Sequence, residues 1–130
     1  MTPIPTGTRY NRTHTVSQAD IDRFAAVSGD TNPIHIDPAV AATTRFGRTI
    51  AHGMLLYGYI RAALRTLAPT GVQRKQTLSF TNPVFAGETI EIVVEVLESN
   101  SNQLRCAVSV VHSDGKVACS GETVLEITHA

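Results

Sequence analysis

The segment from residue 51 to residue 67 constrains the fold of this chain most, because it has the pattern of a helix that is apolar on most sides. It ends before Pro69, and a proline cannot continue a helix. Its apolar side chains are Met54, Leu55, Leu56, Ile60, Ala63, Leu64 and Leu67. A helix with so little polar surface has to be enclosed by the rest of the protein.

The segments after this helix alternate as β-strands do. Between residues 88 and 98, an isoleucine or valine at every second position alternates with Glu91 and Glu95. The strand candidates are 75–81, 88–98, 103–112 and 117–128, with a weaker first strand at 8–16. An apolar helix ahead of an antiparallel meander predicts an α+β domain in which a sheet curls around one helix.

Length and charge limit the classes of function. The chain has 130 residues, 42% of them apolar, and a formal net charge of zero. This length suits one domain over residues 1–130. There is no basic surplus to suggest nucleic acid or an anionic membrane as a partner. We see neither a signal peptide nor an apolar run of the roughly 18 residues that a membrane span needs, so we expect a cytoplasmic protein.

The two cysteines, Cys106 and Cys119, lie in strand-like segments and form no CxxC pair. Residues 113–116 predict a hairpin turn between these segments. A turn centred on Asp114 and Gly115 does not place the cysteines opposite each other. We therefore expect two small buried thiols, which form neither a disulfide nor half of a metal site.

A first helix is predicted after residue 16. Ser17 with Asp20 three residues later indicates a capped helix start, and Gly29 indicates the end of the helix. The residues expected on its apolar face are Ile21, Phe24, Ala25 and Val27. Asp30 is then the first side chain beyond the helix.

The chain turns after this helix. Pro33 lacks a backbone donor and favours an extended residue before it, so we expect Asp30 and His35 to flank a turn rather than share a helix. Asp37 and Pro38 then predict the cap and first residue of a second short helix, which ends near residue 47.

Asp30 and His35 are the candidate catalytic pair. Near neutral pH a carboxylate is ionised and an imidazole exchanges protons. Together they could hold one water, so that one group takes a proton from it and the other gives a proton to carbon. Taken singly, the aspartate has the pattern of a turn residue and the histidine that of a capping or core residue. Their joint occurrence in the string SGDTNPIH, residues 28–35, favours catalysis.

Gly53 is the third candidate catalytic residue. The first N–H groups of a helix have no partner within it, and they lie at the positive end of its dipole. A glycine there lets a ligand oxygen approach the backbone closely, as in an oxyanion hole. On its own, Gly53 fits tight packing of helix on sheet better than it fits an oxyanion hole. His52 is either a further donor to substrate or a structural residue.

Three stretches resemble the MaoC-like (R)-specific enoyl-CoA hydratases, the hydratase 2 family. They are FAAVSGDTNPIH at 24–35 (followed by Ala41), AHGM at 51–54 and LSFTNPVFAGE at 78–88. The resemblance spans about residues 17–96 without a departure from the long motif. It implies a single hot-dog fold, in which an antiparallel sheet wraps a long central helix, and a homodimer whose sheets join edge to edge.

The resemblance also implies an activity: reversible addition of water to a trans-2-enoyl-CoA, which gives the (R)-3-hydroxyacyl-CoA. Asp30 and His35 match the catalytic acid and base of the family, and Gly53 matches the glycine whose N–H holds the thioester carbonyl. No cofactor is implied, since coenzyme A is part of the acyl-CoA substrate. Asn32 lies inside the motif and is assigned to substrate binding.

Further binding residues follow from helical spacing. The positions that share the face of Gly53 are Tyr57, Ile60, Arg61 and Leu64, and we expect them to line or close an acyl tunnel. Arg61 could pair with a carboxylate on the acyl chain or shorten the tunnel. A lone arginine on a mostly apolar helix more often extends to solvent or to a dimer partner, and this second interpretation is favoured. Candidates for the phosphates of coenzyme A are Arg45, Arg48, Arg74 and Lys75, although scattered basic residues commonly form ordinary surface.

The sequence leaves several alternatives open. A zinc site at His35, Asp37 and His52 is disfavoured, because their spacing matches no common ligand motif. The closest alternative function is dehydration of (3R)-hydroxyacyl groups on acyl carrier protein. A hot-dog thioesterase and a non-catalytic thioester-binding protein are further alternatives. Acyl length and the physiological direction are not encoded in any motif of the chain.

Overall fold

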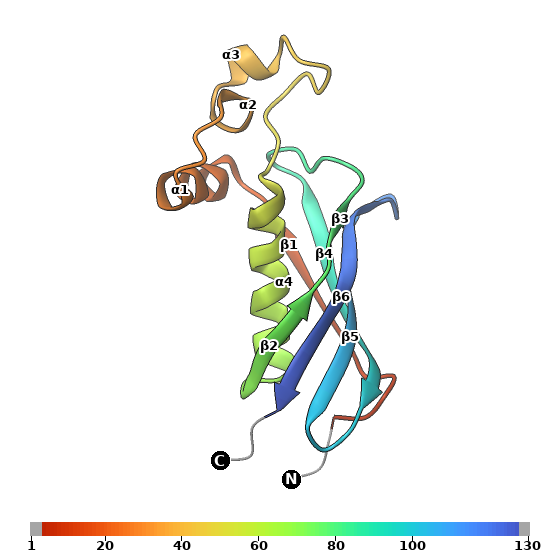
Figure 1. Ribbon diagram of the computed structural model, residues 1–130. Helices are drawn as coiled ribbons and strands as arrows, with labels where there is room; N and C mark the ends of the chain where they lie inside the picture. Colours follow the sequence, from red (N-terminus) through yellow and green to blue (C-terminus); the bar gives the residue numbers. More distant parts are fainter. Residues whose placement is uncertain (1–3, 128–130) are drawn as a thin grey trace.

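The computed structural model describes residues 4–127, which form one curved sheet, one long helix and three short helices (Figure 1). The helices are α1 (Gln18–Ser28), α2 (Pro33–Ile36), α3 (Pro38–Ala41) and α4 (Gly53–Leu67). The strands are β1 (Arg9–Thr15), β2 (Gly71–Gln76), β3 (Ser79–Phe80), β4 (Thr89–Ser99), β5 (Gln103–His112) and β6 (Val117–Ile127).

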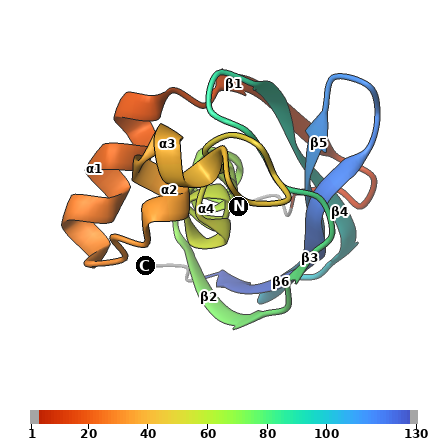
Figure 2. The same ribbon diagram turned by 90° about the horizontal axis from the view of Figure 1, so that it is seen from above.

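The sheet is antiparallel throughout and wraps around α4. Its strand order is β1-β4-β5-β6-β2, and β3 pairs with the other end of β6. Seen along the axis of α4, the strands curve around the helix, and α1 to α3 lie on the side that the sheet leaves open (Figure 2). The predicted hot-dog fold, a sheet around one long helix, is therefore confirmed.

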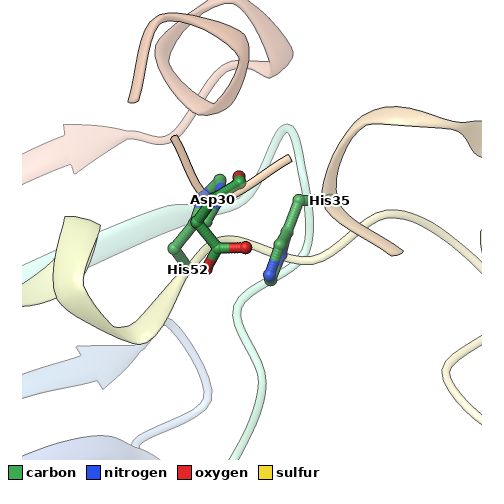
Figure 3. A group of neighbouring side chains, drawn as sticks. All are labelled: Asp30, His35 and His52. Atoms are coloured by element: carbon green, nitrogen blue, oxygen red, sulfur yellow. The ribbon is translucent and has the colours of Figure 1, made fainter. Parts of the chain in front are cut away.

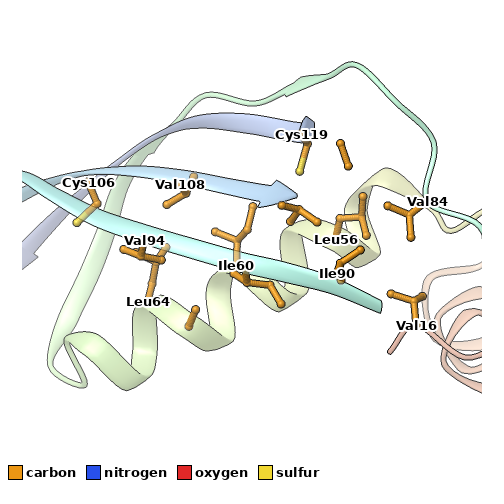
Figure 4. Close-up of a cluster of buried hydrophobic side chains, with 14 of the residues drawn as sticks. Val16, Leu56, Ile60, Leu64, Val84, Ile90, Val94, Cys106, Val108 and Cys119 are labelled. Carbon is orange, nitrogen blue, oxygen red and sulfur yellow. The ribbon is translucent and has the colours of Figure 1, made fainter. Parts of the chain in front are cut away.

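The core lies between α4 and the concave face of the sheet (Figure 4). Alternate residues of β4 and β5 are buried, as the period of two in the sequence predicts. Ile60 and Leu64 of α4 are 0% and 1% exposed and pack against these strands. Full burial of one such side chain contributes roughly 1.5–3 kcal/mol, so this interface holds the helix inside the sheet. Met54 was counted among the apolar side chains of an enclosed helix, but it is 54% exposed.

The cysteines and the last hairpin are as predicted. Cys106 and Cys119 are buried free thiols, and they pair in the sheet with Thr123 and Val110 respectively. Burial raises the pKa of each thiol to about 11. Gly115 has a φ of +90° in the predicted turn. The thiols are therefore protonated, unreactive core groups at neutral pH.

The predicted strand at 75–81 is wrong in its extent. Two strands, β2 and β3, occupy this region, and both pair with the edge of β6 opposite β5, with a break at residues 77–78. A Cβ on Gly121 would lie 1.8 Å from the carbonyl oxygen of Thr77, so only a glycine allows this approach. Hydrogen bonds between Thr77 and Glu122, 3.0 Å in each direction, hold the chain against β6 at this break. Phe80 of β3 then lies against Gly53 at the start of α4.

Residues 17–52 form a segment that lies beyond the N-terminal end of α4, which we call the overhang (Figure 1). Its first helix is capped by Ser17, whose Oγ accepts from the Asp20 N–H, and is terminated by Gly29 with a φ of +79°. Both predictions are confirmed. Val27 is 88% exposed, so the expected apolar face is limited to Ile21 and Ala25, with Phe24 half-buried.

The predictions about the overhang are partly wrong. Asp30 and His35 share no helix, as predicted, but Pro33 opens a one-turn helix, α2, that contains His35. Asn32 caps this turn by accepting from the Ile34 N–H. The next helix, α3, is capped by Asp37 as predicted but ends at Ala41 rather than near residue 47. Similarly, α4 begins at Gly53 and not at residue 51. Single-turn helices leave little periodicity for sequence analysis to detect.

None of the helices within residues 4–127 is long and apolar enough to cross a membrane.

Candidate active site

The backbone around Asp30 holds its carboxylate at the surface. Gly29 ends α1, and the Asp30 N–H then donates to the Oγ of Ser28 at 3.1 Å. The Asp30 carboxylate accepts from the N–H of Asn32 at 3.4 Å. This local turn fixes the direction of the side chain while leaving the residue exposed, so the carboxylate is open to a ligand.

The ring of His35 is held in one tautomer. Its Nδ1 lies 2.7 Å from the backbone oxygen of Ile50, which can only accept. Nδ1 therefore carries the proton, and Nε2 is left with a lone pair. A half-buried imidazole of this kind is suited to take a proton from a bound water.

His52 connects the two parts of the site. It is 2% exposed, and its Nε2–H donates to the backbone oxygen of Asp30 at 2.9 Å. Its ring stacks on that of His35, with centroids 3.8 Å apart and an interplanar angle of 25°. Ligating atoms of Asp30, His35 and His52 all lie within 4.8 Å of one another, and the Asp30 carboxylate faces the His35 ring (Figure 3). The structure thus brings the predicted acid and base together.

Gly53 and His35 line the same cavity, which has a volume of about 370 Å³. Gly53 is the first residue of α4, so its N–H has no partner inside the helix, and no acceptor in the described part of the chain takes it. A Cβ at this position would lie 2.8 Å from the ring of Phe80. The glycine therefore lets the Phe80 ring pack closely against the start of α4, while its N–H stays at a helix N-terminus, where a carbonyl oxygen that gains negative charge is stabilised.

Much of the cavity wall was not predicted as site residues. Besides His35, Gly53 and the phosphate candidate Arg45, the wall consists of Phe46, Ile50, Ala51, Leu56, Phe80, Thr81, Asn82, Pro83 and Val84. Residues 80–84 lie within a stretch of the family resemblance, which is the signal that could have identified them. The wall joins apolar rings to one guanidinium, Arg45, so it suits a ligand with an apolar part and a negative charge.

The other predicted binding residues lie apart from this cavity. Ile60 and Leu64 are core residues, while Arg61 lines a separate small cavity of about 50 Å³ with Leu64. Tyr57 donates to the Oε1 of Gln73 at 2.6 Å, which links α4 to β2. Asn32 is the exposed cap of α2. Their assignment to substrate contact stays a prediction.

Two of the remaining basic candidates, Arg48 and Arg74, make contacts elsewhere, and Lys75 does not line the cavity at Gly53. The guanidinium of Arg48 lies 4.3 Å from the ring centre of Phe85 and 3.9 Å from a carboxylate oxygen of Glu88. Arg74 forms an ion pair with Glu126 at 2.6 Å. Among the four phosphate candidates, only Arg45 lines the cavity at Gly53, and it is exposed.

Asp30, His35 and His52 also have the residue types and proximity of a metal site. An imidazole binds a metal in the plane of its ring, and the planes of two stacked rings do not meet near their nitrogens. The stacking of His35 on His52 therefore disfavours joint chelation. Asp37, the carboxylate first considered for zinc, caps α3 instead. That the reaction needs no metal stays a prediction.

A second polar cluster anchors the overhang to the core. The carboxylate of Asp20 accepts from His14 of β1 at 2.8 Å and from Tyr59 of α4 at 3.1 Å. The hydrogen bond from His14 holds the pKa of Asp20 below its usual value, and burial raises the pKa of Tyr59. α1 is thus tied to both a strand and the central helix.

The chain is similar to known hydratases and dehydratases. The chain is 38% identical over 113 residues to an (R)-specific enoyl-CoA hydratase of Aeromonas caviae, covering 84% of each protein. It is 38% identical over 115 residues to a 3-hydroxybutyryl-CoA dehydratase of Methylorubrum extorquens, covering 86% of this chain and 73% of that protein. An unliganded R-hydratase from Pseudomonas aeruginosa superposes with a TM-score of 0.92 at 39% identity, covering 98% of this chain and 84% of that one. The family described as MaoC like domain matches residues 2–117, and the chain belongs to this family.

Proposed function

We infer that this protein is an enoyl-CoA hydratase, which adds water to trans-2-enoyl-CoA to give (R)-3-hydroxyacyl-CoA and also catalyses the reverse dehydration. The observation that carries this function is the meeting of an Asp30 carboxylate and a His35 imidazole next to a cavity at the N-terminus of α4. The hydratase and dehydratase relatives support the same reaction.

In the proposed reaction Gly53 binds the thioester oxygen, while Asp30 and His35 hold the water that is added. The thioester oxygen accepts from the Gly53 N–H, which draws electron density from the β-carbon. A water held between Asp30 and His35 attacks that carbon, and the Nε2 lone pair of His35 takes one of its protons. The charge of the resulting enolate is stabilised by the same N–H. The proton held by the pair then passes to the α-carbon, so that H and OH of one water reach the same face.

The assay that tests this function is the loss of enoyl-thioester absorbance from crotonyl-CoA. We expect turnover, a product that chiral analysis identifies as (R)-3-hydroxybutyryl-CoA, and no effect of chelators. Activity only with a carrier-protein thioester would favour the acyl-carrier alternative. Release of free thiol without hydration would indicate a thioesterase and contradict the proposal.

We propose that the protein acts as a homodimer in the cytoplasm. The family resemblance supports a dimer joined through sheet edges, and β2 and β3 at one edge expose Val72 and Phe80, 41% and 50% respectively. Two unpaired buried thiols are compatible with a reducing compartment. Light scattering after size exclusion tests the dimer, for which a monomeric mass at assay concentration would be the contrary result.

A further inference from the structure

One side chain of the overhang contacts both segments that hold His35. The amide of Gln18, in the first turn of α1, donates from Nε2 to the backbone oxygen of His35 at 2.9 Å. Its Oε1 accepts from the hydroxyl of Thr49 at 2.7 Å. Thr49 is 5% exposed, one of the few buried polar residues in the described part of the chain. Gln18 therefore bridges α2 to the strand-like segment before α4.

These contacts close a ring of hydrogen bonds around His35. The residue after Thr49, Ile50, accepts from the His35 Nδ1–H at 2.7 Å and donates its own N–H to the backbone oxygen of Ile34 at 3.3 Å. Gln18 and Thr49 thus fix the two backbone segments between which the imidazole is held. If either contact is lost, the acceptor that sets the tautomer of His35 is free to move relative to the ring.

The site requires a neutral amide rather than a carboxylate. The backbone oxygen of His35 needs a donor and the Thr49 hydroxyl an acceptor, and an amide supplies both. The second N–H of Gln18 donates to the exposed Asp22 at 2.9 Å. A glutamate at position 18 would place negative charge against the His35 carbonyl and against Asp22. The two hydrogen bonds of Gln18, to the His35 backbone oxygen and from the Thr49 hydroxyl, therefore explain why this residue is a glutamine.

We propose that Gln18 and Thr49 are positioning residues for the reaction, which act by keeping the His35 imidazole in its Nδ1–H tautomer and its Nε2 lone pair aimed at the water. This inference rests on the proposed function. Neither residue lines the cavity, so both act through His35 rather than on substrate.

The test compares Gln18→Ala and Thr49→Val with two matched controls. Asp22→Ala removes only the solvent-facing partner of Gln18, and Thr49→Ser keeps the hydroxyl. We expect Gln18→Ala and Thr49→Val to lower kcat about 10- to 100-fold, as misplacement of a catalytic group does. KM should stay within about twofold, since neither residue contacts substrate. Both controls should retain near-normal kcat.

A second readout does not depend on turnover. Nitrogen-15 NMR of the neutral ring should report the Nδ1–H tautomer of His35 in the wild type and a mixture of tautomers in Gln18→Ala. An unchanged tautomer, or full kcat in folded Gln18→Ala and Thr49→Val, would overturn the inference. A wild-type protein that hydrates no enoyl thioester would instead refute the proposed function, and the NMR comparison would still decide whether Gln18 positions the ring.

Discussion

The sheet with α4 and the overhang are held by different forces. In the first region, alternate residues of β4 and β5 and the inner face of α4 form a continuous apolar cluster. In residues 17–52 the buried apolar side chains are small in number: Ile21, Ala25, Ala41 and Ala51. Here the chain is shaped by side-chain contacts to backbone, such as the caps formed by Ser17, Asn32 and Asp37.

This difference explains where the chemistry is located. Apolar burial stabilises a fold but removes side chains from water, so it cannot present a carboxylate and an imidazole to a substrate. A segment held by hydrogen bonds fixes the direction of such side chains while leaving them accessible to substrate. The overhang therefore contributes little to the free energy of unfolding and most of the reactive groups, while the core contributes the helix N-terminus at Gly53.

The largest expected effect is on activity, from changes in the overhang. Asp30→Asn and His35→Ala should each lower kcat by about 10²- to 10⁴-fold, because each removes a proton-transfer group. Thermal unfolding should shift little, since Asp30 is exposed and His35 half-buried. Steady-state kinetics and circular dichroism melts on the same samples check this. A folded variant with near-normal turnover would show that the assignment of the pair is wrong.

The opposite pattern is expected in the core. Leu64→Ala should lower the free energy of unfolding by about 2–5 kcal/mol, because it leaves a cavity at a side chain that is 1% exposed. Denaturant titration measures the loss. Met54→Ala is the matched control on the same helix, where 54% exposure predicts a change within about 0.5 kcal/mol. Equal losses at both positions would contradict this account of the core.

Gly53 lies where the two regions meet. Gly53→Ala should leave the fold intact, because the nearest obstacle is the ring of Phe80, a half-exposed side chain that can rotate. The displaced Phe80 ring would change the shape of the cavity at the helix N-terminus, where we propose that the thioester binds, and we expect kcat/KM to fall about 100-fold. Normal kcat/KM in the variant would exclude a close approach of substrate to this backbone.

The smallest expected effect concerns the anchor between the regions. Asp20→Asn weakens the contacts to His14 and Tyr59 and should lower stability by about 1–2 kcal/mol at neutral pH. Because the folded pKa of Asp20 lies below its usual value, the wild-type advantage is complete above the unfolded pKa. It should disappear as pH falls through the folded pKa. Melting curves from pH 7 to pH 2 test this, and a gap that persists at the acid end would disprove it.

The sequence predicted the core better than the overhang, for a physical reason. Alternation in β4 and burial on α4 are periodic, so strand and helix bounds differed from the structure by only a residue or two. The break between β2 and β3 was missed, because it depends on the approach of Thr77 to Gly121, far away in the sequence. No local pattern encodes such a contact.

In the candidate site, too, residues within a local sequence motif were predicted, and residues that depend on contacts distant in the sequence were not. Asp30, His35 and Gly53 were found because their strings resemble a family, and the structure brings them to one end of α4. Gln18 and Thr49 are 31 residues apart and have ordinary local roles, so neither was noticed. Helical spacing from Gly53 pointed to Ile60, which is 0% exposed in the core and whose contact with substrate stays a prediction. Spacing identifies a face of a helix but not what covers it.

The most direct test of the account is a crystal structure of the protein with (R)-3-hydroxybutyryl-CoA bound. We predict that the thioester oxygen accepts a hydrogen bond from the Gly53 N–H and that the 3-hydroxyl lies within hydrogen-bond distance of both Asp30 and His35. A thioester bound away from the start of α4, or a hydroxyl out of reach of both side chains, would contradict it.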